Sequence, residues 1–194
     1  MKPQYVLEKL NEFKDDDAIV VTDVGQHQMW AAQYMRFKEP RSFLSSGGLG
    51  AMGFCLPAAL GAKLGAPDRT VIVVIGDGGI QMNMQELGTA AEHKLPLKII
   101  ILNNQRLGMV RQLQEFYCDK RYFAVDFHFD LDFAALARLY GMEGYTVKTE
   151  EQLLEILPRA LSSPEGVIVN CIVDREENVL PMVLSGSPIN EAID

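Results

Sequence analysis

The chain has 194 residues, a length that predicts one domain, over 1–194, with a single sizeable hydrophobic core. Apolar residues make up 48% and charged residues 23%, which is typical of a globular protein, and no apolar run is long enough to predict a membrane span. The net charge of −8 disfavours nucleic acid as a partner, because binding a phosphate backbone needs a basic surface.

Strands alternate with helices along the chain. The predicted elements, in order, are a helix over 6–13, a strand over 18–22, helices over 27–34 and 52–64, a strand over 70–75, a helix over 82–93, a strand over 98–102, helices over 110–117 and 133–140, a strand over 145–147, a helix opened by the capping box 149–152 and ending at about 161, and a strand over 166–173. Asp132 is a predicted N-cap and Gly141 a predicted helix stop. Residues 118–131 lack a clear period, and we interpret them as a loop of the kind that often forms a lid.

The strands predicted at 70–75 and 98–102 are apolar without polar alternation. Such strands are typical of a sheet that is covered on both faces, and the repeated β-then-α order indicates parallel pairing. The predicted fold class is therefore α/β, a doubly wound parallel sheet with helices on both faces. Ligands bind such sheets outside the carboxyl ends of the strands, at a switch point, which directs attention to the residues after 22, 75 and 102.

Each of these three strands runs into a polar or glycine-rich turn. The sequence Gly76-Asp77-Gly78-Gly79 follows the second strand, and its glycines let the backbone turn sharply and approach a ligand. The helix predicted after it offers free N–H groups and a positive dipole end, which suit a diphosphate. Asp77 and the amide oxygen of Asn104, after the next strand, are the hard oxygen ligands that Mg²⁺ prefers.

Plainer interpretations compete with these. A Gly-Asp-Gly turn alone is more often structural, and Asn103-Asn104 at a second strand end makes a ligand site the better hypothesis. Residues 48–53 match the GxGxxG pattern of dinucleotide-binding proteins, but they lack a clear preceding strand and a later acidic residue at a strand end. Taken alone, His27 is equally a helix N-terminal residue, and Met52 is core filler.

The cysteines and the first residues indicate a compartment. Cys55, Cys118 and Cys171 are odd in number and form no CxxC pair, so they read as reduced thiols, with no disulfide and no zinc site. The first residues carry no apolar stretch of a secretory signal. We therefore expect a cytoplasmic protein.

The spacing of Gly76-Asp77-Gly78, 24 residues and Asn103-Asn104 resembles the signature of thiamine-diphosphate enzymes. Further segments look like the catalytic (large) subunit of acetolactate (acetohydroxyacid) synthase: 25–30, 47–53, 56–59, 102–110 and 177–183. The similarity runs from about Tyr5 to Glu191 and corresponds to the C-terminal thiamine-diphosphate-binding domain. Leu113 departs from a tryptophan that is frequent in the family, and 184–186 depart from its Pro-Pro-Gly, which puts substrate preference and closure of the C-terminal arm in question.

The resemblance implies thiamine diphosphate and Mg²⁺ as cofactors. It implies Mg²⁺ ligands at Asp77, Asn104 and the carbonyl of Arg106. It implies cofactor binding by Gly25, Gln26, His27, Gly50, Met52, Gly76, Asp77, Gly78, Gly79, Asn104, Leu107, Gly108 and Met109. No catalytic residue is expected in this chain, because the family's activating glutamate belongs to the partner subunit's pyrimidine-binding domain. That domain and the FAD-binding middle domain are expected to lie outside these 194 residues, so we expect the chain alone to be inactive and not to bind FAD.

The implied reaction condenses two pyruvates, or pyruvate and 2-oxobutyrate, to 2-acetolactate or 2-aceto-2-hydroxybutyrate with release of CO₂, in branched-chain amino acid biosynthesis. Implied partners are a second copy in a homodimer and a small regulatory subunit, with no nucleic acid and no membrane. Two alternatives stay open: a domain of another thiamine-diphosphate-dependent 2-oxo acid decarboxylase, oxidase or carboligase, and a non-catalytic cofactor-binding module.

Overall fold

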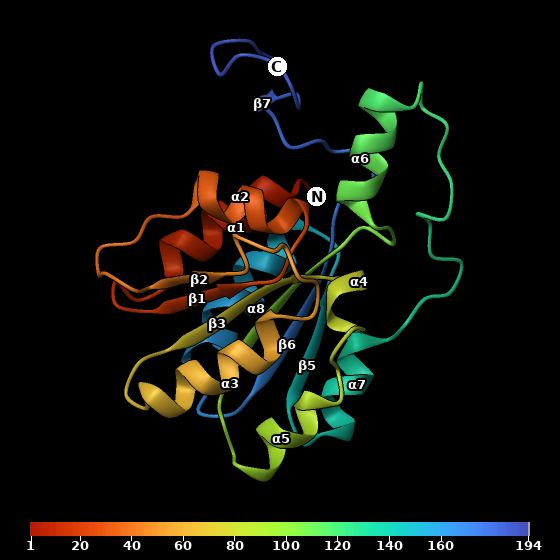
Figure 1. The fold of residues 1–194 in the computed structure, drawn as a ribbon. Helices are drawn as coiled ribbons and strands as arrows, with labels where there is room; N and C mark the ends of the chain where they lie inside the picture. Colours follow the sequence, from red (N-terminus) through yellow and green to blue (C-terminus); the bar gives the residue numbers. More distant parts are fainter. Residues whose placement is uncertain (194) are drawn as a thin grey trace.

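Six parallel strands form the central sheet of the computed structural model, which describes residues 1–193 (Figure 1). Their order across the sheet is β2-β1-β3-β4-β6-β5. The strands are β1 (Ile19–Thr22), β2 (Phe43–Ser45), β3 (Val71–Gly76), β4 (Lys98–Asn103), β5 (Glu143–Val147) and β6 (Val167–Ile172). A second, antiparallel pair joins β7 (Met182–Val183) to β8 (Ala192–Ile193). The predicted parallel α/β fold is confirmed.

Helices cover both faces of the sheet, as the apolar strands require. The helices are α1 (Pro3–Phe13), α2 (Gln26–Tyr34), α3 (Cys55–Gly65), α4 (Asp77–Ile80), α5 (Glu86–Glu92), α6 (Gly108–Tyr117), α7 (Phe133–Leu139) and α8 (Glu150–Ser162). Alternate strand residues point to opposite faces. Val74 belongs to a core shared with α1, α2 and α8, whereas Val73 belongs to a core shared with α3, α5 and α7. Figure 1 shows α6 standing beyond these layers, with the C-terminal tail near it.

Most predicted boundaries hold, and the predicted caps are confirmed. The side chain of Asp132 accepts a hydrogen bond from the Ala135 N–H at 2.9 Å, and Thr149 accepts one from the Gln152 N–H at 3.3 Å. Gly141 ends α7 with φ of +72°, a left-handed conformation that glycine adopts readily. Residues 118–131 contain no helix and no strand, which agrees with the predicted loop.

Two helix predictions are wrong, for related reasons. The helix predicted to begin at Met52 begins at Cys55, because Gly53 has φ of +87° and breaks the helical path. The helix predicted over 82–93 begins only at Glu86, as α5, and the separate short helix α4 ends before it, at Ile80. Between them, the amide of Asn83 donates to the carbonyl of Gly53 at 2.7 Å, so the two irregular loops hold each other.

The strand β2 and the pair β7–β8 had no sequence prediction. β2 has three half-buried residues and pairs with β1 at the edge of the sheet, with Phe43 opposite Val20. Strands of two or three residues are too short for their periodicity to be recognised. Within residues 1–193, none of the helices combines the length and the apolar composition that a membrane span requires.

Two Gly→Ala substitutions should change the free energy of unfolding in opposite directions, because Gly144 is packed against α7 and Gly61 is open to solvent. A Cβ added at Gly144 would lie 2.1 Å from the backbone oxygen of Ala134, whereas one added at Gly61, on the exposed side of α3, meets nothing within 4 Å in the described chain. Gly144→Ala should lower the free energy of unfolding by about 1–3 kcal/mol through overpacking. Gly61→Ala should raise it by about 0.4–1 kcal/mol by restricting the unfolded chain. Urea denaturation measures both, and equal effects would contradict this packing.

Candidate cofactor site

The carboxyl ends of three neighbouring strands converge at one edge of the sheet. β3 lies between β1 and β4, with Thr22 opposite Val74 and Gly76 opposite Leu102. The chain leaves β1 toward β2 on one side and leaves β3 toward β4 on the other, which makes this edge a topological switch point. A cleft opens there and encloses about 490 Å³, counting the part that is open to solvent.

The cleft gathers nearly all the residues that the sequence singled out. Gly25, Gln26 and His27 come from the turn after β1, Gly76, Asp77, Gly78 and Gly79 from the turn after β3, Asn104, Arg106, Leu107, Gly108 and Met109 from the turn after β4, and Met52 from the loop before α3. Gly50 does not line the cleft and lies exposed in the 47–50 turn. Sequence reasoning found the apolar lining residues Met52, Leu107 and Met109 but missed five others, Val24, Trp30, Leu102, Val110 and Val173.

Asp77 is the first residue of α4 and is 3% exposed. Burial raises the pKa of its carboxyl to about 7, although the backbone N–H groups of Asp77, Asn104, Gly78 and Gln105 act in the opposite direction. These amides show that the carboxylate of Asp77 lies against the end of β4. Its Oδ1 atom has no hydrogen-bond partner among residues 1–193. A buried carboxylate oxygen without a partner is costly, and a bound cation would satisfy it.

The turn after β4 is folded around its own asparagines. The side-chain oxygen of Asn103 accepts from the Gln105 N–H, and that of Asn104 accepts from the Arg106 N–H, each at 3.1 Å. Gln105 is left-handed with φ of +54°. Within the described residues, no hydrogen bond reaches the carbonyl oxygen of Arg106. The turn thus leaves one carbonyl available and keeps Asn104 next to Asp77.

A metal at this point would have few protein ligands. In the part of the chain that the structure describes, no three His, Cys, Asp or Glu side chains are placed to hold a metal ion together. The oxygens of Asp77, Asn104 and Arg106 therefore suit an ion that also binds ligand phosphates and water. Mg²⁺ usually binds in this way, whereas a structural zinc ion takes four protein ligands, mostly Cys and His.

Of the two reasons predicted for the three glycines at the end of β3, a sharp turn and close approach, the structure corrects the first. Gly76, Gly78 and Gly79 have no positive φ, so they do not make a left-handed turn. A Cβ at Gly78 would lie 2.8 Å from Leu107 Cδ2, and one at Gly79 would lie 2.4 Å from Asp23 Oδ2. The long helix expected to present its N-terminus here is also replaced by α4, a single turn of four residues.

His27 lies beneath the cleft against the glycine backbone. A Cβ at Gly25 would lie 2.9 Å from His27 Cε1, and Gly25 itself has φ of +149°, so this position requires glycine. Burial lowers the pKa of His27 to about 4, so the imidazole is neutral at pH 7. Its Nε2 atom lacks a hydrogen-bond partner within residues 1–193. Trp30 follows three residues later on the same face of α2, a spacing that could have predicted its place in the lining.

Gln26 lines the cleft, but its amide is engaged elsewhere. Its Nε2 atom donates to the side-chain oxygen of Gln112 at 2.7 Å and to the carbonyl of Glu177 at 3.0 Å. Its Oε1 atom packs against Gly108, and a Cβ added to Gly108 would lie only 2.1 Å from it. The two halves of this side chain therefore connect the turn after β1 with α6 and the C-terminal segment.

Comparison with known proteins identifies the domain. The profile of the family "Thiamine pyrophosphate enzyme, C-terminal TPP binding domain" matches residues 23–171, which contain all three turns. The chain belongs to this family. Its cleft is therefore the place to seek the sites of thiamine diphosphate (TPP), and the resemblance to the TPP enzymes is confirmed.

The TPP-binding domain is also similar to acetolactate synthases. It is 43% identical over 189 residues to the acetolactate synthase isozyme 2 large subunit of Escherichia coli (strain K12), covering 97% of this chain and 34% of that protein. It is 50% identical over 185 residues to the acetolactate synthase large subunit of Parasynechococcus marenigrum (strain WH8102), covering 95% and 30%. The protein of the same name from Lactococcus lactis subsp. lactis (strain IL1403) is 40% identical over 193 residues, covering 100% and 33%. The chain spans about a third of the length of these relatives.

The buried carboxylate predicts that Asp77→Asn stabilises the cofactor-free domain. The folded pKa of Asp77 is raised from 3.8 to about 7, so its contribution to stability is greatest at low pH and is lost as the pH rises from about 4 to 7. At pH 8 the free energy of unfolding of Asp77→Asn should exceed that of the wild type by about 1–3 kcal/mol. Asp68→Asn, in an exposed turn, is the control. A destabilised Asp77→Asn protein at pH 8 would contradict the unpartnered carboxylate.

The neutral His27 predicts a loss of stability in acid. The unfolded chain protonates this histidine near pH 6.5, whereas the folded chain resists protonation until about pH 4, so stability falls as the pH falls between these values. From pH 7.5 to pH 5, the wild type should lose about 2 kcal/mol more than His27→Gln. Asp77 is present in both proteins, so its opposite pH dependence cancels in the difference. Parallel stability curves would show that His27 is not buried in its neutral form.

Proposed function

We propose that this domain holds the diphosphate end of TPP and a Mg²⁺ ion in an acetolactate synthase. The observation that carries the proposal is the buried Asp77 carboxylate, which has an oxygen without a partner among residues 1–193 and faces the Asn104 turn on the next strand. Asp77, Asn104 and the Arg106 carbonyl would bind Mg²⁺, which would bridge to the phosphates. When bound, TPP supplies the carbanion chemistry that decarboxylation and carboligation of 2-oxo acids require.

The other residues of the cleft would orient the cofactor. The backbone of Gly78, Gly79 and Gly108 lines the cleft and would offer N–H groups to phosphate oxygens, and the net charge of −8 fits recognition by amides and a metal in place of lysines. Neutral His27, whose single N–H has the backbone of Asp23 as its acceptor, would lie against the diphosphate site without adding charge. Gln26 would face the diphosphate, and Gly25, Gly50 and Gly76 would support the turns around it. Met52, which is 37% exposed at the cleft, would support the cofactor, with Leu107 and Met109 nearby.

The proposed reaction is the one that the relatives' name describes. Pyruvate would lose CO₂ and its two-carbon unit would join a second pyruvate or 2-oxobutyrate, giving 2-acetolactate or 2-aceto-2-hydroxybutyrate for branched-chain amino acid biosynthesis. The activating glutamate, FAD, a second copy and a small regulatory subunit would come from outside these 194 residues, in the cytoplasm. Identities of 40–50% to acetolactate synthases favour this reaction over the other chemistries of TPP enzymes.

The binding half of the proposal predicts TPP affinity that depends on Mg²⁺ and on Asp77. Calorimetric titration of the chain with TPP should show binding with Mg²⁺ and at least tenfold weaker binding with EDTA, since phosphates and carboxylate would repel each other without the ion (about 1.4 kcal/mol or more). Asp77→Asn should bind weakly in both buffers, while Asp68→Asn should behave as the wild type. Mg²⁺-independent binding would contradict the metal assignment.

The reaction itself needs the other domains. The chain should be joined to the remaining domains of the Escherichia coli isozyme 2 large subunit, to which it is 43% identical, and incubated with pyruvate. We expect acetolactate from the chimera, none from its Asp77→Asn variant and none from the chain alone. Acetaldehyde or acetoin without acetolactate would indicate another TPP-dependent decarboxylase or carboligase. Acetolactate from the isolated chain would contradict the expected need for an external glutamate.

A further inference from the structure

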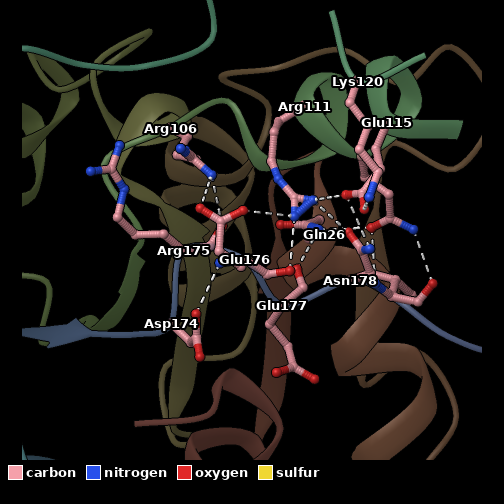
Figure 2. Close-up of polar contacts among 12 residues, drawn as sticks. Gln26, Arg106, Arg111, Glu115, Lys120, Asp174, Arg175, Glu176, Glu177 and Asn178 are labelled. Carbon is pink, nitrogen blue, oxygen red and sulfur yellow. Dashed lines mark hydrogen bonds and ion pairs between the residues drawn. The ribbon is translucent and has the colours of Figure 1, made fainter. Parts of the chain in front are cut away.

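The C-terminal segment 174–179, here called the strap, contacts four separate parts of the domain. It begins just after Val173, which lines the cleft, and it is bonded to α1 through Gln4. Its other bonds reach α2, α6 and the turn after β4 (Figure 2). The family profile ends at residue 171, so the strap lies beyond the matched segment. Its contacts show how residues outside the cleft can act on the cleft.

Arg111 of α6 is the buried centre of these contacts. The residue is 2% exposed, and its Nη1 donates to Asn178 Oδ1 at 2.8 Å while its Nη2 donates to the Glu176 carbonyl at 2.8 Å. The same guanidinium pairs with Glu115 one turn along α6, and the ring of Tyr122 lies 5.9 Å from it. Figure 2 shows Arg111 and Glu115 reaching from α6 toward the strap. Arg111 does not line the cleft, so it would not touch a cofactor there.

The first path from the strap to the cleft runs through two glutamines. Gln112 is fully buried and bonds both backbone groups of Val179, accepting from its N–H at 2.9 Å and donating to its carbonyl at 3.0 Å. Gln26 then donates to Gln112 and to the Glu177 carbonyl. With its Nε2 held in this way, the Oε1 atom of Gln26 stays against Gly108 in the cleft.

The second path runs through an ion cluster to the turn after β4. Glu176 places Oε1 2.7 Å from Arg106 Nη1 and Oε2 3.4 Å from Arg111 Nη2, so one carboxylate joins both arginines. The Nε of Arg106 pairs with Asp126 at 2.6 Å, and Arg175 pairs with the same carboxylate oxygen at 2.9 Å. The residue whose carbonyl is a proposed Mg²⁺ ligand is therefore held by its own side chain to the strap and to the 118–131 loop.

We propose that Arg111 is a positioning residue, which fastens the strap to α6 and thereby holds Gln26 and the Arg106 turn in the arrangement that binds TPP and Mg²⁺. The inference rests on the proposed function. A buried guanidinium is costly unless its partners remain in place, so the strap and α6 keep one relative position while Arg111 is bonded to both. Release of the strap would take the Glu177 carbonyl from Gln26 and the Glu176 carboxylate from Arg106, leaving Gln112 and Asp126 as their partners.

Two substitutions separate the paths, and two controls separate positioning from stability. Arg111→Met keeps an apolar stem and removes the bonds from Arg111 to Asn178 and to Glu176, whereas Glu176→Gln, whose side chain is 66% exposed, weakens only the ion cluster. Arg111→Lys keeps the charge, but an ammonium group cannot bond Asn178 and the Glu176 carbonyl at the same time as the planar guanidinium does. Lys38→Met breaks an exposed ion pair with Asp16 that involves no strap residue, and Leu157→Ala destabilises the core under α8.

TPP affinity at saturating Mg²⁺, measured well below the melting temperature, is the first readout. Arg111→Met should bind about tenfold more weakly, the size expected for hydrogen bonds to a charged group. Glu176→Gln should bind about threefold more weakly, and Arg111→Lys should recover part of the loss. Lys38→Met and Leu157→Ala should retain wild-type affinity. Wild-type affinity in Arg111→Met, or an equal loss in Leu157→Ala, overturns the proposal.

Hydrogen exchange of the cofactor-free chain is the second readout, and it does not depend on the proposed function. Arg111→Met should accelerate exchange at 104–109 as well as at 174–179, whereas Leu157→Ala should leave 104–109 unchanged relative to its own global stability. Acceleration confined to 174–179 overturns the coupling. If the wild-type chain does not bind TPP, the proposed function fails, and exchange at 104–109 still decides whether Arg111 positions the turn.

Discussion

The placement of one buried carboxylate governs the site. Asp77 stands where β3 becomes α4, almost without exposure, and its Oδ1 finds no partner within the described chain. Folding alone gives no reason to bury a charge in this way, since burial raises its pKa to about 7. The backbone amides of Asn104 and Gln105 favour the charged form of this carboxylate, and its Oδ1 stays available. A cation at this point would turn the least favourable feature of the domain into its main binding group.

The rest of the fold serves this placement. Parallel pairing in register brings the turns after β3 and β4 to the same height, so that Asn104 lies beside Asp77 without any covalent constraint. Glycines at 78 and 79 let the turn pack against Leu107 and Asp23, where any side chain would collide. Apolar strands anchor these turns from below, because helices on both faces bury them completely. The strap then bonds to both α2 and the turn after β4, and so connects them.

The sequence alone predicts what local patterns determine. The apolar runs of β3 and β4, the caps of α7 and α8, and the positions of Asp77 and Asn104 at two strand ends could all be recognised. The start of α3 could not, because Gly53 is left-handed and is bonded to Asn83, 30 residues away. The strap contacts were also beyond prediction, since Gln26 meets Gln112 across 86 residues and Glu177 across 151. Family resemblance supplied the roles of Met52 and Gly50, and of these two only Met52 lines the cleft.

A crystal structure of the chain with TPP and Mg²⁺ tests the central claim most directly. The account predicts an ion at about 2.0–2.1 Å from a carboxylate oxygen of Asp77, with the side-chain oxygen of Asn104, the carbonyl of Arg106 and two phosphoryl oxygens completing its coordination together with water. Electron density for the diphosphate at another edge of the sheet, or an Asp77 carboxylate that has no contact with the ion, would contradict it.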